Sequence, residues 1–191
     1  MNLLHHWILN SNYWKRTVRE EIVPWGLTDV HLGDKILELG PGPGVTTDLL
    51  RQSHRHITCL EIDPQLAHGL RQSFSGTNVT VVNGDAASLP FPDGTFSGAV
   101  AFTMLHHVPS PKLQDRILAE VCRVLRPAGV FAGTDSRWSL MMPIVHLFDT
   151  MVLVPPESMA ARLKAAGFAD VRVDTAKSRF RFVARKPATP A

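Results

Sequence analysis

The chain has 191 residues, of which 45% are hydrophobic and 19% are charged, and its formal net charge is +3. This composition excludes a disordered chain and supplies enough apolar side chains for the core of one domain over residues 1–191. The small positive charge is spread along the chain, so it indicates a solvated surface rather than a nucleic-acid interface.

Cysteine content and apolar segments bear on the compartment of the protein. Cys59 and Cys122 each lie in an apolar run, which favours buried thiols in a reducing compartment over a disulfide or a zinc site. The N-terminus lacks the basic and apolar regions of a signal peptide. The longest apolar segment, Leu140–Val154, is interrupted by a proline and two polar residues, whereas a membrane span needs ~20 apolar residues. We expect a cytoplasmic protein with no transmembrane segment and no metal site.

Strands and helices alternate along most of the chain. Residues Tyr13–Val23 predict a helix that Pro24 closes, because proline cannot donate a helical hydrogen bond. Strands are expected near 35–39, 57–62, 79–83, 97–102 and 130–135, and helices near Val45–Gln52, Gln65–Phe74 and Pro111–Leu125. This alternation predicts a parallel sheet covered on both faces by helices.

The pattern changes near the C-terminus. Ser158–Ala166 predicts a helix that ends at Gly167. Val171–Asp174 and Phe180–Val183 then alternate apolar and polar residues, and a short polar turn joins them. Two further strands are therefore expected after the last helix.

A glycine-rich turn follows the first predicted strand. Gly40, Gly42 and Gly44 recur at every second position after the acid Glu38, while Glu61 and Asp85 end the next two apolar runs. Glycines let a backbone approach a ligand closely, since no Cβ intervenes. Ligands of parallel α/β sheets bind beyond the carboxyl ends of the strands, where all three acids are expected. These residues therefore predict a nucleoside pocket.

The spacing of the glycines helps to decide which nucleoside binds. Dinucleotide-binding turns use G-x-G-x-x-G, but the sixth position here is Val45, and Glu38 would repel a pyrophosphate. S-adenosylmethionine carries an ammonium and a sulfonium and has no phosphate, so it fits better. A nicotinamide-dependent oxidoreductase is a remote alternative.

Several segments of the chain carry the motifs of one family. They are Glu38–Gly44, which matches E/D-x-G-x-G-x-G, then Glu61–Pro64, Gly84–Phe91, Phe96–Phe102 with Met104–Val108, and Glu120–Val130. On these segments the chain resembles class I S-adenosylmethionine-dependent methyltransferases of the small-molecule type, related to ubiquinone and menaquinone methylases. The resemblance is specific from about Lys35 to Gly133 and looser to about Arg185. It implies S-adenosylmethionine as the cofactor and S-adenosylhomocysteine (SAH) as the product.

The resemblance also implies a fold. We expect an α/β domain with a Rossmann-like, seven-stranded, mostly parallel sheet, helices on both faces and a C-terminal antiparallel strand pair. Residues 1–30 would form an N-terminal helical cap, 31–135 the cofactor-binding core, 136–157 a variable substrate-side segment, and 158–186 the C-terminal helix and strand pair.

The same resemblance assigns cofactor contacts residue by residue. The expected set is Glu38, Gly40, Pro41, Gly42, Gly44, Glu61, Ile62, Asp85, Ala86 and Thr103. Glu61 would hold both ribose hydroxyls, Asp85 the adenine amino group with a backbone amide from Ala86, and Thr103 the methionine end. The residues alone leave other roles open, because Glu38 and Glu61 could be solvated acids and Asp85 could cap the residues after it.

Candidate catalytic and acceptor-binding residues are less sharply indicated. His106 and His107 follow the fourth strand, and an imidazole there could act as a general base or could simply shape the pocket. Tyr13, Trp14 and Trp138 are candidate substrate contacts, although ordinary packing explains them equally well. Asp135 stands without an evident partner in the sequence, which argues against metal-dependent chemistry.

We therefore expect methyl transfer to a small metabolite, with O- or C-methylation favoured. The apolar segment 137–156 suggests a hydrophobic acceptor, but a core helix or a dimer-forming helix would look the same. The alternative is a non-catalytic S-adenosylmethionine-binding module or regulatory subunit. The protein would be a monomer or a homodimer.

Overall fold

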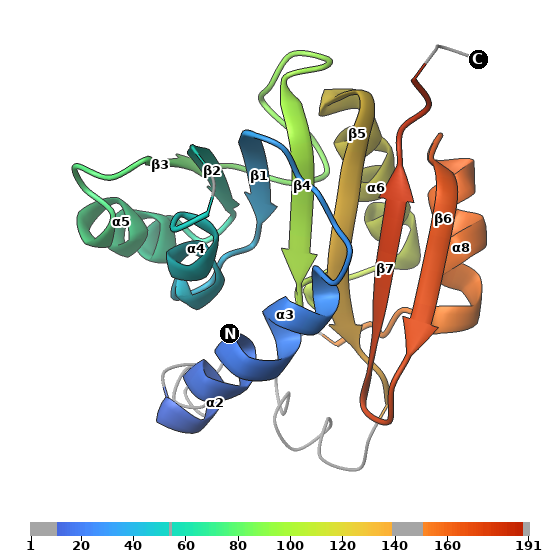
Figure 1. Cartoon of the computed structure of the whole chain (residues 1–191), viewed down its shortest axis with the longest axis horizontal. Helices are drawn as coiled ribbons and strands as arrows, with labels where there is room; N and C mark the ends of the chain where they lie inside the picture. Colours follow the sequence, from blue (N-terminus) through green and yellow to red (C-terminus); the bar gives the residue numbers. More distant parts are fainter. Residues whose placement is uncertain (1–10, 54, 139–150, 189–191) are drawn as a thin grey trace.

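The computed structural model describes residues 11–53, 55–138 and 151–188, and one seven-stranded sheet runs through them (Figure 1). Its strand order is β3-β2-β1-β4-β5-β7-β6. The strands are β1 Lys35–Leu39, β2 His56–Glu61, β3 Val79–Asn83, β4 Phe96–Phe102, β5 Leu125–Ser136, β6 Ala169–Thr175 and β7 Arg179–Arg185. Strands β1 to β5 pair in parallel, whereas β7 is antiparallel to both β5 and β6. The expected mostly parallel sheet with an antiparallel C-terminal pair is confirmed.

Helical segments flank both faces of this sheet. They are α2 Asn12–Thr17, the π-helix η1 Val18–Ile22, α3 Val23–Gly26, α4 Val45–Leu50, α5 Pro64–Ser73, the 3-10 turn η2 Leu105–His107, α6 Pro111–Val124 and α8 Pro156–Ala165. In Figure 1, α6 and α8 lie behind the sheet, while α3 and α4 lie in front of it. Parts of the predicted cap and substrate-side segment, residues 1–10 and 139–150, lie outside the described residues.

Alternating side chains of the central strands build a core on each face. Leu37 and Leu39 of β1 pack with Val121 of α6 and Leu163 of α8. Ile36, on the opposite face of β1, packs in a second cluster with the N-terminal helical segment and α4. Because both faces are covered, the central strands are apolar in nearly every position, which is typical of parallel sheets.

The predicted end of the N-terminal helix at Pro24 is wrong. The chain stays helical to Gly26, with Pro24 in the first turn of α3, directly after the π-helical turn. Proline is tolerated at a first helical turn, where its missing N–H is not needed. Gly26 then lies against the ends of β4 and β5, since a Cβ there would be 2.8 Å from Phe102 and 2.9 Å from Thr134.

Polar side chains cap the start of α5 and of α6. Asp63 accepts hydrogen bonds from the amides of Gln65 and Leu66, which confirms it as the N-cap of α5. Ser110 caps α6 in the same way. Among the described helices, all fall short of the length and apolar character that crossing a bilayer requires.

Candidate active site

The carboxyl ends of β1 and β2 bring Glu61 beside the glycine turn. Its Oε2 accepts a hydrogen bond of 3.1 Å from the Gly42 amide, and its Oε1 accepts one of 3.1 Å from the Asp63 amide. Burial raises the pKa of Glu61, although these two amides oppose the rise. A buried carboxylate that faces a turn lying across the strand ends is suited to accept hydrogen bonds from ligand hydroxyls.

Glu38 lies beneath the same turn and is only 1% exposed. The hydroxyl of Thr47 donates to its carboxylate at 2.6 Å, and the Thr46 hydroxyl donates to the other oxygen. Both threonines belong to the first turn of α4, so Glu38 holds the start of this helix against β1. Desolvation raises the pKa of Glu38, while the hydroxyl donors lower it in part.

This raised pKa predicts a pH dependence of stability. Since the folded-state pKa of Glu38 lies above its unfolded value, its contribution is fully present below the unfolded pKa of ~4.3 and is lost as pH rises through the folded pKa. In Glu38→Gln the unfolding free energy should therefore fall less steeply as pH rises above this value. The decrease that remains is the part contributed by Glu61, whose pKa is also raised. Urea unfolding of the ligand-free protein across pH measures it, and parallel curves for wild type and variant would contradict it.

The glycine turn has one open position and one closed position. A Cβ added at Gly42, whose φ is +56°, would meet no atom within 4 Å. At Gly44, whose φ is +86°, it would lie 2.8 Å from side-chain atoms of both Leu70 on α5 and Phe74, the C-cap of this helix. A side chain at Gly44 would therefore clash with the packing of the fold, whereas the space beside Gly42 is open.

Alanine at these two positions should separate stability from binding. Gly44→Ala combines left-handed strain with a clash and should lower the unfolding free energy by about 2–5 kcal/mol. Gly42→Ala adds only strain, about 1 kcal/mol, yet its methyl group should weaken SAH binding ~10-fold or more by filling the ligand's space. Urea unfolding and SAH titration of both variants test this, and unchanged SAH affinity in Gly42→Ala would argue against a ligand there.

The carboxyl ends of β2 and β3 lie next to the glycine turn on the same edge of the sheet. Ile62 follows the buried acid Glu61 and is 68% exposed. Asp85 is exposed after β3, and its Oδ1 accepts a hydrogen bond of 2.8 Å from the Ala87 amide. Residues 86–88 form a turn rather than a helix, and the Ser88 amide donates to the Asp85 carbonyl at 3.0 Å, so Asp85 caps a turn. Ala86 is half-buried within it.

The loop after β4 holds a strained residue at the same edge. Thr103 has a φ of +51°, which is rare for a β-branched side chain and costs ~1–3 kcal/mol. Its amide donates to the Thr134 carbonyl at 2.8 Å, which ties the loop to β5. The next residue, Met104, covers Gly40 of the glycine turn, since a Cβ there would be 2.5 Å from the Met104 Cγ. Backbone strain of this kind concentrates at functional sites.

His106 and Asp135 form a buried pair at the ends of β4 and β5. His106 is 3% exposed, and its Nδ1 contacts the Asp135 carboxylate. The other Asp135 oxygen accepts from the His106 amide at 3.1 Å, and the Ser136 amide adds a bond of 2.6 Å. The sequence offers no acidic partner for Asp135, and the structure pairs it instead with an imidazole from a loop 29 residues earlier in the chain.

This pairing fixes how the imidazole is held. A carboxylate oxygen can accept a hydrogen bond from Nδ1, which favours the tautomer in which Nε2 is the basic nitrogen. His107 is half-buried beside it, with ring centroids 4.1 Å apart. His106 therefore has a carboxylate that orients its imidazole, as a general base requires.

Of the aromatic candidates, Tyr13 and Trp14 lie on α2, whereas Trp138 follows β5. Trp14 of α2 packs against the front core, whereas Tyr13 and Trp138 are exposed. Trp138 follows the end of β5, two residues after the strand that carries Asp135. The structure therefore gives Trp14 a packing role and leaves Tyr13 and Trp138 as surface aromatic groups.

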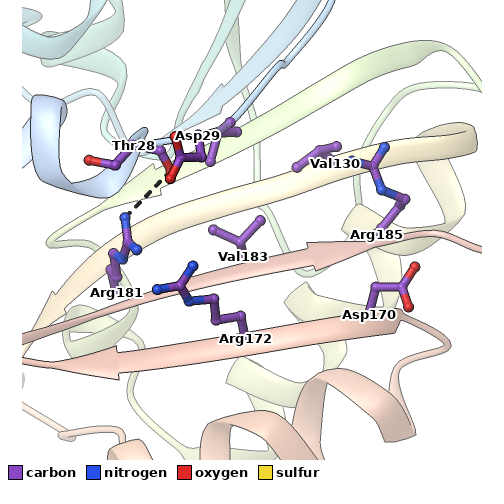
Figure 2. A pocket seen from close by; sticks show the side chains of 9 residues that line it. Thr28, Asp29, Val130, Asp170, Arg172, Arg181, Val183 and Arg185 are labelled. Carbon is purple, nitrogen blue, oxygen red and sulfur yellow. Dashed lines mark hydrogen bonds between the residues drawn. The ribbon is translucent and has the colours of Figure 1, made fainter.

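A separate cleft of about 200 Å³ lies over β5, β7 and β6 (Figure 2). Figure 2 shows the guanidinium groups of Arg172, Arg181 and Arg185 around Val183. Arg181 is already held by Asp174 at 2.8 Å and by the Trp25 carbonyl at 2.8 Å. None of the predicted site residues lines this cleft.

The strand order and the glycine turn define a Rossmann-like domain, with Glu38 in β1, Glu61 at the end of β2 and Asp85 after β3 near one edge of the sheet. A family model described as a methyltransferase domain matches residues 37–133, about half of the chain. The chain belongs to this family and is a class I S-adenosylmethionine-dependent methyltransferase by descent.

Curated relatives extend this match. The chain is 27% identical over 184 residues to a 2-methyl-6-phytyl-1,4-hydroquinone methyltransferase of Oryza sativa subsp. japonica, covering 91% of the chain and 52% of that protein. It is 34% identical over 149 residues to an uncharacterized methyltransferase of Synechocystis sp., covering 73% and 69%. A fatty-acid O-methyltransferase of Mycolicibacterium smegmatis is 35% identical over 107 residues, covering 55% and 38%. The chain thus spans about half the length of the rice enzyme.

Solved structures agree on the fold. The PH0226 protein of Pyrococcus horikoshii has a TM-score of 0.79 at 17% identity and covers 93% of both chains. The methyltransferase CalH in complex with SAH has a TM-score of 0.67 at 21% identity, covering 81% of this chain and 51% of that one. At such identities the likeness shows the fold alone.

Proposed function

We propose that this chain binds S-adenosylmethionine at the carboxyl ends of β1 to β4 and moves its methyl group to a small hydrophobic acceptor. The observation that carries the proposal is Glu61, a buried carboxylate bonded to the amide of Gly42, where the turn leaves open space. A hydroxyl-rich ribose matches an acceptor-only carboxylate, and family membership supports the choice of cofactor.

Each end of the cofactor has candidate partners among the described residues. Glu61 would take the ribose hydroxyls, the exposed Ile62 would cover the adenine face, and Asp85 with the Ala86 amide would hold the adenine edge. The methionine end would lie along Gly40, Pro41, Gly44 and Thr103, with Glu38 acting from beneath by holding α4. When bound, the cofactor supplies a methyl group activated by its sulfonium leaving group.

His106 is the proposed general base, with Asp135 orienting it. The Asp135 carboxylate fixes the proton on Nδ1 and would stabilise the imidazolium that forms when Nε2 takes a proton from the acceptor. Burial of the pair excludes water from this step. Positioning of the acceptor supplies most of the remaining rate, since proximity alone can be worth ~7–11 kcal/mol.

The acceptor is proposed to be a hydroquinone with an apolar tail. The relative from rice acts on such a compound by its printed name, and a second relative acts on a fatty acid. Exposed Trp138 and Tyr13 supply aromatic surface suited to an apolar tail. The structure of the methylated product will show whether the methyl group is transferred to an oxygen or to a ring carbon.

Two assays test the function together. SAH at ~100 times its dissociation constant should stabilise the protein by ~2.7 kcal/mol, roughly 5–10 °C in a thermal melt. Methyl-labelled S-adenosylmethionine should then label 2-methyl-6-phytyl-1,4-hydroquinone, with product mass and NMR giving the methylated atom. SAH binding without transfer to this hydroquinone or to a long-chain fatty acid would indicate a binding module, and a melt indifferent to SAH would reject the cofactor site.

A further inference from the structure

A buried amide side chain joins three segments around the His106 turn. Gln114 of α6 is 1% exposed, and its Nε2 donates to the Leu105 carbonyl at 3.1 Å and to the Val152 carbonyl at 2.8 Å. Its Oε1 accepts from Arg162 of α8 at 2.9 Å. Both of its hydrogens and its oxygen are therefore used, as a buried amide requires.

Val152 is held at both of its backbone groups. Its amide donates to the His106 carbonyl at 2.8 Å, while its carbonyl accepts from Gln114. The residues around it, 151–154, are all apolar, and Val154 is buried in the core behind the sheet. The last part of the predicted substrate-side segment is thus fastened directly to the residue proposed as the base.

Arg162 decides which way the Gln114 amide points. Its Nε donates to Asp115 at 2.5 Å and its Nη2 to the Pro111 carbonyl at 3.0 Å, which leaves Nη1 for Gln114. A guanidinium can only donate, so the amide oxygen must face Arg162 and the NH₂ group must face the two carbonyls. The network allows a single orientation of the amide.

We propose that Gln114 is a positioning residue that sets where segment 151–154 lies relative to His106, and so where the acceptor sits relative to its base. The inference rests on the proposed function, in which His106 takes a proton from the acceptor. Misplacement of a reacting group by about 1 Å can cost ~100-fold in rate, so one buried amide controls transfer without touching the cofactor.

Gln114→Glu is the sharpest test, because it keeps the shape of the side chain and the partner of Arg162. It replaces both donors with an oxygen that faces the Leu105 and Val152 carbonyls, so the tie between the segments should break. We expect faster hydrogen exchange at the Val152 amide, a higher KM for 2-methyl-6-phytyl-1,4-hydroquinone and a kcat ~10-fold lower or more. SAH affinity should stay within twofold. Gln72→Glu, on the exposed side of α5, makes the same charge change as a control.

The outcomes separate this inference from the function on which it rests. If the wild type transfers methyl groups and Gln114→Glu has the same KM and kcat, the positioning role alone is overturned. It is also overturned if Gln114→Glu loses SAH affinity in parallel with turnover. No transfer by the wild type overturns the proposed function, and the positioning role with it. If Gln114→Glu does not fold, Arg162→Met frees the amide to rotate while keeping Gln114, and it should raise the acceptor KM in the same direction.

Discussion

Replacement of Glu61 by alanine is expected to weaken SAH binding by ~100-fold or more. Each hydrogen bond from a ribose hydroxyl to a buried carboxylate contributes ~1.5–3 kcal/mol, and Glu61 is proposed to accept two of them. The substitution also removes the acceptor of the Gly42 amide, so the turn itself loses its tether. Isothermal titration with SAH measures the affinity, and the SAH-induced shift of the melt should vanish.

Two companion variants make this result specific. Glu61→Gln keeps the volume and one acceptor oxygen, so it should bind SAH between wild type and Glu61→Ala. Glu157→Ala removes an exposed acid from the first turn of α8 and should leave SAH affinity unchanged. Equal SAH affinity in the wild type and Glu61→Ala would contradict the proposal that Glu61 binds the ribose hydroxyls. The proposed pocket would then lack its main cofactor contact.

The raised pKa of Glu61 gives the same interaction a pH dependence. Only the ionised carboxylate accepts from both ribose hydroxyls, so SAH affinity should increase as pH rises through the raised pKa and level off above it. The titrations that test Glu61→Ala, repeated across pH, should show this slope in the wild type and none in Glu61→Gln.

Loss of the His106 imidazole should slow methyl transfer to a hydroquinone by ~10²–10⁴-fold, the usual contribution of a general base. A phenolic hydroxyl has a pKa of ~10 and needs a base at neutral pH, whereas a fatty-acid carboxylate is already ionised. His106→Ala should therefore impair labelling of 2-methyl-6-phytyl-1,4-hydroquinone far more than any labelling of a long-chain fatty acid. Initial rates with each acceptor at saturating S-adenosylmethionine give the comparison.

Asp135→Asn probes the orientation of the same imidazole. Asparagine keeps the shape but offers both a donor and an acceptor, so Nδ1 no longer has a fixed proton and the rate should fall in the direction of His106→Ala. His68→Ala, an exposed histidine of α5, controls for the loss of a histidine elsewhere. Equal losses with both acceptors would assign the pair to structure rather than to proton transfer.

Local patterns predicted most of the elements because they depend on neighbouring residues. The strands at 35–39 and 79–83 lie where apolar runs end in glycine or polar residues, and Asp63 caps α5 as its position before a proline suggests. The continuation of the first helix past Pro24 was not foreseen, because a π-helical turn before the proline depends on how the helix packs on the sheet.

The sequence by itself determined the class of fold, and it predicted the candidate cofactor contacts. Alternating apolar runs and the spacing of Gly40, Gly42 and Gly44 are local signals that can be read from the sequence alone. Tertiary structure alone decided how the carboxylates and the imidazole are used. The buried Glu38 carboxylate accepts from the hydroxyls of Thr46 and Thr47. Because β4 pairs with β5, Asp135 lies beside His106. Such contacts join residues distant in sequence, and no local pattern encodes which buried polar groups will satisfy one another.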